Sequence, residues 1–87
     1  MARFKADVHV TLRRTVNDPE GLTIKGALSE LGFAEIADLR AGKYIEIWLE
    51  AADGETAAQR AEVMCDKLLA NPVIEDYRVE VEEVDRR

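Results

Sequence analysis

The chain has few side chains that could carry out chemistry, among them one histidine, His9, and one cysteine, Cys65. A zinc site needs three or four Cys, His or carboxylate ligands at close spacing, and none surrounds His9. A nucleophilic cysteine needs a base and an accessible, electropositive setting, whereas Cys65 lies on an apolar stripe between Met64 and Leu68. We therefore expect His9 at the surface or an interface, and Cys65 packed as a small hydrophobic side chain.

Two charged stretches could also be sites. An acidic run near the C-terminal end could form an acid–base pair or hold a metal, but it alternates with apolar residues as a solvated strand face does. It comprises Glu75, Asp76, Glu80, Glu82 and Glu83. The stretch from Arg40 to Lys43 places two cations around a glycine, but a phosphate-binding loop would need several glycines opening a helix. We interpret it as a charged hairpin turn, with contact to an acidic partner surface as the alternative.

Tyr44 and Trp48 lie on the same face of a predicted strand. Exposed aromatic side chains on a sheet could stack RNA bases, but that function needs a basic surface. This chain has 12 basic and 18 acidic residues, a formal net charge of −6. A protein–protein interface therefore explains the aromatic pair best, with packing at a sheet edge and RNA binding as the weaker alternatives.

Size and composition predict a single globular domain over residues 1–87, with 47% hydrophobic and 34% charged residues. One cysteine permits no internal disulfide, which fits a reducing compartment. The start of the chain, Met1 to Val10, alternates instead of being continuously apolar, so we expect neither a signal peptide nor a membrane span. The acidic balance disfavours binding to nucleic acid or to an anionic membrane. The sequence thus predicts a cytoplasmic protein.

The first elements follow from periodicity and capping residues. Apolar side chains alternate from Phe4 to Leu12, which predicts a half-buried strand. Asp18 is a good N-cap and Pro19 fits the first helical position. The predicted helix carries one apolar stripe and ends at Gly32 in a left-handed conformation. The stripe consists of Ile24, Ala27, Leu28 and Leu31.

The rest of the chain predicts three more strands and a second helix. Residues Glu35 to Arg40 read as a strand, and Ala41-Gly42 as the turn of a hairpin to a third strand over Tyr44–Glu50. A helix from about residue 55 to 70 would be capped by Asp53 and stopped by Asn71-Pro72. A fourth strand would run through Tyr77, Val79 and Val81, and Asp85-Arg86-Arg87 would form a frayed end.

The order β-α-β-β-α-β predicts an α+β ferredoxin-like sandwich, a four-stranded antiparallel sheet with two helices on one face. No helix would cover the other face of the sheet. That open face would carry His9, Thr11, Tyr44, Trp48 and Arg78.

Several motifs in this order and spacing resemble the PurS family, the small subunit of phosphoribosylformylglycinamidine synthase. They are Val8-His9-Val10-Thr11-Leu12, Asp18-Pro19-Glu20-Gly21, Ala27-Leu28 with Leu31-Gly32-Phe33, Arg40 through Glu46, and Met64-Cys65 with Leu68 through Tyr77. Each motif is weak alone, but together they cover more than three-quarters of the chain.

The resemblance implies a required but non-catalytic subunit of a purine-biosynthesis ligase. In such a complex a glutaminase subunit (PurQ-like) releases ammonia. A synthetase subunit (PurL-like) uses ATP and Mg to add it to formylglycinamide ribonucleotide. The small subunit would bridge the two, bind no cofactor itself and form a homodimer or a dimer of dimers.

We expect the interface residues to be Asn17, Asp18, Arg40, Lys43, Tyr44 and Trp48. Tyr44 and Trp48 would make a homodimer contact, while the other four would meet the larger subunits. A small-molecule-binding regulatory module of the same fold is the alternative, but it would have a glycine-rich loop where this chain has only Gly21. An independent enzyme would need a polar cluster that the spacing does not provide.

Overall fold

The computed structural model describes residues 1–14 and 16–84. Within them a three-stranded antiparallel sheet has the order β2-β1-β3. The strands are β1 (Ala2–Leu12), β2 (Gly42–Ala51) and β3 (Glu75–Val84). Three of the four predicted strands are therefore confirmed, and the predicted frayed end at residues 85–87 lies outside the described part of the chain.

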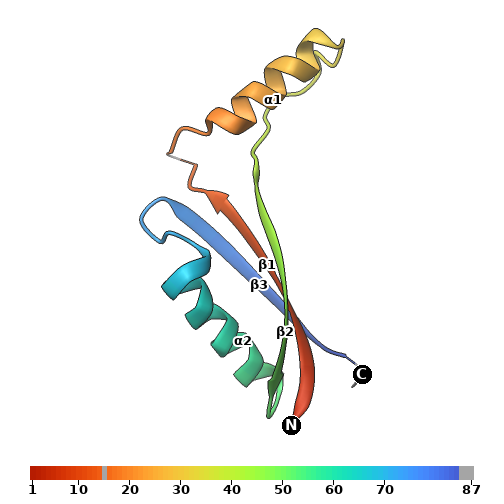
Figure 1. The fold of residues 1–87 in the computed structure, drawn as a ribbon. Coiled ribbons are helices and arrows are strands. Elements are labelled where there is room, and N and C mark those ends of the chain that lie inside the picture. The colour runs from red at the N-terminus through yellow and green to blue at the C-terminus, as the bar shows by residue number, and fades with distance from the viewer. Residues whose placement is uncertain (15, 85–87) are drawn as a thin grey trace.

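The two helices are placed very differently. α2 (Gly54–Met64) lies along one face of the sheet, whereas α1 (Pro19–Glu30) projects beyond the end of the sheet (Figure 1). Both begin as predicted, since Asp18 caps α1 and Asp53 caps α2 through hydrogen bonds to backbone amides. In the described residues no helix is both long and apolar enough to cross a membrane.

The helix that begins with α2 ends in a wider turn. The chain continues from α2 through a π-helical turn over Cys65–Leu69, in which the Ala70 amide donates to the Cys65 carbonyl at 3.0 Å. Ala70 then takes an extended conformation, and Asn71-Pro72 follows. The predicted helix stop is confirmed.

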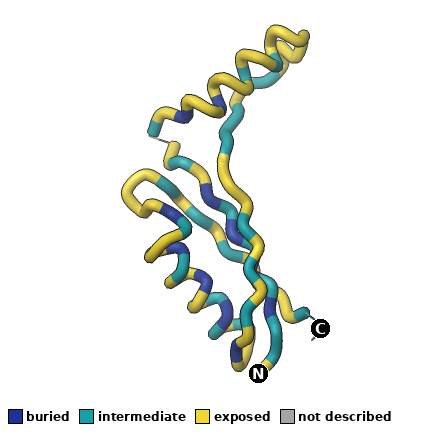
Figure 2. The backbone as a smooth tube through the Cα atoms, viewed as in Figure 1, coloured by how far each residue is buried: buried dark blue, intermediate teal, exposed yellow. Residues whose placement is uncertain are grey.

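The core lies between β1 and α2. β1 is the central strand, and Val8 faces Ile45 of β2 on one side and Val79 of β3 on the other. Figure 2 shows the buried positions along β1 and along the side of α2 that faces the sheet. They include Phe4, Ala6, Val8 and Val10 of β1, and Ala57, Ala61 and Cys65 of the helix. These helix side chains are small, so the helix can lie close to the sheet.

The predicted strand over Glu35–Arg40 and its hairpin are wrong. After Gly32, which has the predicted positive φ of 104°, the chain runs through turns and an extended segment straight into β2. A two-residue hairpin turn needs positive φ at one or both central residues, and Gly32 is the only described residue with positive φ. Ala41 and Gly42 thus continue the line of β2 and do not reverse it.

The predicted four-stranded sheet with two helices on one face is not formed by the single chain. Within the described residues the sheet has three strands, and α2 alone covers it. The apolar stripe that predicted burial of α1 is correctly spaced, but Ile24, Ala27 and Leu31 are exposed. The α+β class is confirmed, and the position of α1 is the main departure from the prediction.

Replacing Gly42 by alanine should destabilise the fold, because the new Cβ would collide with the carbonyl oxygen of Val10. We expect a loss of about 1–3 kcal/mol in the free energy of unfolding, measured by chemical denaturation. Gly26→Ala is the matched control, since a Cβ there meets nothing within 4 Å and alanine favours helix by about 1 kcal/mol. Equal effects at the two glycines would contradict this account.

Candidate functional site

A buried carboxylate joins α1 to the sheet. Asp18 is only 6% exposed, and its two oxygens accept hydrogen bonds from the Gly21 amide at 3.0 Å and the Ala41 amide at 2.9 Å. These backbone hydrogen bonds, with the Arg40 guanidinium 4.0 Å away, hold the pKa of Asp18 below its ordinary value of 3.8. A single side chain thus connects the first turn of α1 to the residue that precedes β2.

Arg40 completes this junction from the other side. Its guanidinium donates to the carbonyl oxygens of Leu12 and Arg13, each at 2.8 Å, where β1 ends. Gly21 is required here because a Cβ at that position would collide with the Asp18 carboxylate. We call Asp18, Gly21, Arg40 and Ala41 the hinge.

The hinge changes the interpretation of two of the sequence motifs. The stretch from Arg40 to Lys43 is no hairpin turn, and the carboxylate of Asp18 is occupied by bonds within the chain. Asn17 and Lys43 are exposed beside the hinge. Sequence reasoning identified Asp18 as a cap but missed that it reaches residue 41, because nothing local to either segment records that contact.

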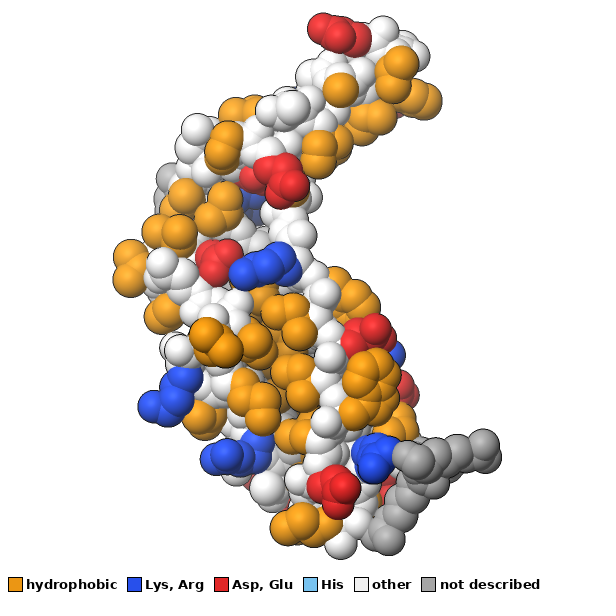
Figure 3. All heavy atoms as spheres, in the orientation of Figure 1, with side chains coloured by type: hydrophobic (Ala, Val, Ile, Leu, Met, Phe, Trp, Pro, Cys, Tyr) orange, Lys and Arg blue, Asp and Glu red, His pale blue; other side chains and the backbone are white. Residues whose placement is uncertain are grey.

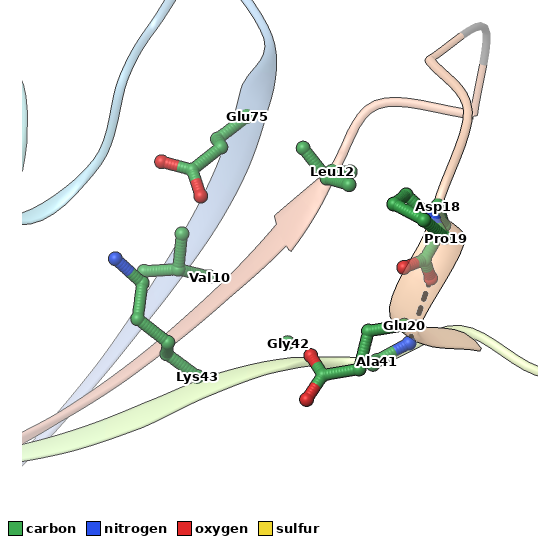
Figure 4. Close-up of a pocket in the computed structure, with 9 residues that line it drawn as sticks. All are labelled: Val10, Leu12, Asp18, Pro19, Glu20, Ala41, Gly42, Lys43 and Glu75. Atoms are coloured by element: carbon green, nitrogen blue, oxygen red, sulfur yellow. Dashed lines mark hydrogen bonds between the residues drawn. The ribbon is translucent and has the colours of Figure 1, made fainter. Parts of the chain in front are cut away.

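An open cleft of about 290 Å³ lies beside the hinge, and Asp18 and Ala41 of the hinge form part of its lining. Figure 4 shows its lining, which comes from the end of β1, the first residue of β3, the first turn of α1 and the start of β2. Lys43, Glu20 and Glu75 line it together with apolar residues such as Val10 and Leu12. These three charged groups come from three separate elements, and the carboxylate of Asp18 also lines the cleft.

The predicted aromatic pair lies on the open face of the sheet. Tyr44 is 53% and Trp48 57% exposed, so the predicted lack of a covering helix is confirmed for the described chain. Lys5 lies 5.7 Å from the centre of a Trp48 ring and 2.7 Å from the Glu46 carboxylate. The Tyr44 hydroxyl donates to Asp7 at 2.8 Å. Charges of both signs therefore surround the two aromatic side chains.

These contacts fix the charge state of the face. The hydrogen bond to Asp7 raises the pKa of Tyr44 to about 12, and the same bond lowers the pKa of Asp7. The Glu46 carboxylate raises the pKa of Lys5. At neutral pH the face thus carries a neutral phenol, carboxylates and an ammonium group.

His9 and Cys65, the other two candidates, lie on opposite faces of the sheet. His9 is on the open face, with Nε2 3.4 Å from Glu80 and its ring centre 5.0 Å from that of Tyr44. Cys65 is fully buried, and burial with the nearby Asp66 and Glu62 raises the pKa of its thiol, so the thiolate is disfavoured. No group of three or more His, Cys, Asp or Glu side chains in the described residues could hold a metal ion.

The comparison with known proteins decides the family. The profile of the PurS family, described as phosphoribosylformylglycinamidine (FGAM) synthase, matches residues 5–83. This chain belongs to the PurS family. The resemblance drawn from the motifs is thereby confirmed.

Individual PurS proteins match over nearly their whole length. The phosphoribosylformylglycinamidine synthase subunit PurS of Bacillus subtilis is 47% identical over 81 residues, 93% of this chain and 95% of that one. The crystal structure of Methanocaldococcus jannaschii PurS, a subunit of formylglycinamide ribonucleotide amidotransferase, has a TM-score of 0.85 at 41% identity and covers 94% and 99% of the two chains. A structure of PurLQS from Thermotoga maritima matches with a TM-score of 0.83 at 39% identity, covering 97% and 100%.

The hinge predicts a specific dependence of stability on pH. Because the pKa of Asp18 is lower in the folded chain, the unfolded chain binds more protons, and stability must fall as pH decreases below about 4. Asp18→Asn should reduce this slope and lower stability at pH 7, since an amide nitrogen cannot accept the second backbone hydrogen. Part of the slope should remain, because the pKa of Asp53 is lowered as well.

The measurement is the midpoint of urea unfolding between pH 7 and pH 3. Asp76→Asn is the control for removing one carboxylate, since that side chain is 68% exposed at the surface. A slope unchanged by Asp18→Asn would show that the carboxylate is not held as described.

Proposed function

We propose that this PurS chain is the small accessory subunit of FGAM synthase, a purine-biosynthesis ligase. It would hold a glutaminase subunit and an ATP-using synthetase subunit together so that ammonia passes between them. The observation that carries the proposal is the match to the PurLQS structure over 97% of the chain. The described residues form a three-stranded sheet with exposed aromatic side chains on one face, in keeping with a positioning role.

The chemistry of ammonia explains why such a subunit would be needed. Ammonia released into neutral water is protonated and loses the lone pair that attacks the acceptor. An assembly that aligns the two active sites and excludes water avoids that loss. A subunit with this role needs complementary surfaces and a rigid frame, and it needs no general acid or base.

The contacts with the larger subunits are proposed near the hinge. Asn17 and Lys43 are exposed there and can reach a partner, whereas Asp18 and Arg40 would act by fixing the direction of α1. ATP and Mg would be bound by the synthetase subunit, and this chain would bind neither. The proposed location of the complex is the cytoplasm.

The open face is proposed as a surface for self-association. An isologous contact brings the same patch of two copies together, so a patch with charges of both signs around exposed aromatics can be self-complementary. Tyr44 and Trp48, with Lys5 and Asp7 beside them, meet that requirement. The contact would contribute to a homodimer or a dimer of dimers. The predicted four-stranded ferredoxin-like arrangement would need a further strand beside β2 or β3, which contact between the open faces does not supply.

Reconstitution tests the bridging role. The two larger subunits would be assayed for formylglycinamidine ribonucleotide synthesis with glutamine or with ammonium as nitrogen donor, with and without this chain. We expect omission to abolish most glutamine-dependent synthesis while much of the ammonium-dependent synthesis is retained. Unchanged glutamine-dependent synthesis without this chain would refute the bridging role.

The open face is tested by Trp48→Asp. The new carboxylate would oppose its copy across the proposed contact, so sedimentation should show a smaller assembly than the original chain forms at the same concentration. Val63→Asp is the matched control, because Val63 is 41% exposed on α2, away from the open face. An assembly unchanged by Trp48→Asp would exclude the open face as a self-association surface.

A further inference from the structure

β3 forms one edge of the sheet, and no strand in the described residues pairs with its outer side. The strand is regular, since all ten of its residues from Glu75 to Val84 pair with β1 in one unbroken register. It contains neither a bulge nor a proline, two of the features that close an edge strand to further pairing. Its outer side therefore presents an uninterrupted row of backbone donors and acceptors.

The charge of this edge is strongly negative. β3 carries five carboxylates and one guanidinium, so its net charge is −4, compared with −6 for the whole chain. The carboxylates are those of Glu75, Asp76, Glu80, Glu82 and Glu83. The other edge strand, β2, has only two carboxylates and one ammonium group, and Figure 3 shows hydrophobic side chains gathered over the body around α2 and β2. The two edges of the sheet thus differ in charge.

The two sides of β3 also differ in character. Val79 pairs with the buried Val8, so Val79 and its alternate neighbours Tyr77 and Val81 face the core. These three side chains are only half-buried, which leaves room for apolar side chains beside them. The side chains on the open face are charged. They are Asp76, Arg78, Glu80 and Glu82.

A hollow of about 250 Å³ lies beside β3 on the open face. Three of its lining residues are Asp7, Glu80 and Glu82. Lys5 stands opposite Glu82 in the register, but its ammonium group lies 2.7 Å from the carboxylate of Glu46 on β2. The Glu80 side chain is 63% exposed. The hollow can therefore receive a cationic group from outside the chain.

We infer that the outer edge of β3 receives an extended segment of a partner protein in which apolar side chains alternate with Lys or Arg. The segment pairs with the free backbone groups of β3 as an added strand. Its apolar side chains cover Tyr77, Val79 and Val81. Its cationic side chains lie beside Glu80 and Glu82, one of them in the hollow.

The acidic edge selects among possible partners. Pairing of two β3 strands from two copies of this chain would place carboxylates opposite carboxylates, which is destabilising. The same charges attract a cationic strand, so they decide which strand is admitted instead of closing the edge to all. The edge is separate from the aromatic pair of the open face, because Tyr44 and Trp48 belong to β2 at the opposite edge.

The first test uses a synthetic peptide of about eight residues in which valine alternates with lysine and arginine. We expect saturable binding by fluorescence anisotropy at low salt, weakened as salt is added. A scrambled peptide of the same composition should bind at least about tenfold more weakly, because it cannot place all its cations on one side of a strand. At saturating peptide, hydrogen exchange of the outward amides of β3 should slow at least about tenfold, while that of β2 stays unchanged.

The second test reverses the charge of the edge. Glu80→Lys with Glu82→Lys should raise the dissociation constant of the alternating peptide at least about tenfold, and Glu80→Gln with Glu82→Gln should raise it less. Glu30→Lys with Glu35→Lys is the matched control, since it makes the same change of net charge at exposed residues away from β3. The control should change the constant by less than about threefold. Urea unfolding would establish that each variant folds.

Several outcomes would overturn the inference. They are absence of binding at about 1 mM peptide, equal binding of the scrambled peptide, unchanged exchange of the β3 amides, and equal weakening by the two lysine pairs. Equal weakening would mean that the peptide is attracted by net charge alone. The assay contains neither larger subunit, so failure here leaves the bridging role open to its own test.

Discussion

The arrangement of this chain depends on one buried carboxylate. Asp18 accepts backbone hydrogens from Gly21 and Ala41, which are close in space but belong to different segments. Leaving a buried carboxylate without these hydrogen bonds would destabilise the folded chain, so the bonds hold the two segments together. Arg40 adds the end of β1 to the same junction. The direction of α1 and the path of residues 34–41 both follow from this contact.

The hinge and the pairing of β1 with β2 also account for two glycines whose role the sequence alone does not show. Gly21 leaves room for the carboxylate, and Gly42 leaves room for the carbonyl of Val10. Neither glycine has a positive φ. Each is therefore needed because it has no side chain, and not because its backbone can adopt a left-handed conformation. The motifs around Asp18 and Arg40 are therefore explained by the junction they build, although they look like separate local signals.

Much of the fold could be predicted because its signals are local. The alternation in β1, the Asp53 cap and the Asn71-Pro72 stop each depend on a few neighbouring residues, and each is confirmed. The buried state of Cys65 followed from helical spacing. The predicted strand over Glu35–Arg40 depended on more than its neighbouring residues, because it needed a turn at Ala41-Gly42 to pair it with the next strand. Whether that turn forms depends on Asp18, more than twenty residues earlier, and such a contact leaves no periodic pattern.

The failed part of the prediction has a physical meaning of its own. An apolar stripe of correct spacing indicates that a helix will be buried, but it does not say against which chain. The same holds for an edge strand, since backbone groups pair equally well with a segment of another copy. In the described residues the outer side of β2 pairs with no strand, and α1 lies beyond the end of the sheet, where the hinge holds it (Figure 1). The four-stranded order that the sequence predicts is therefore not completed by the described residues of a single copy.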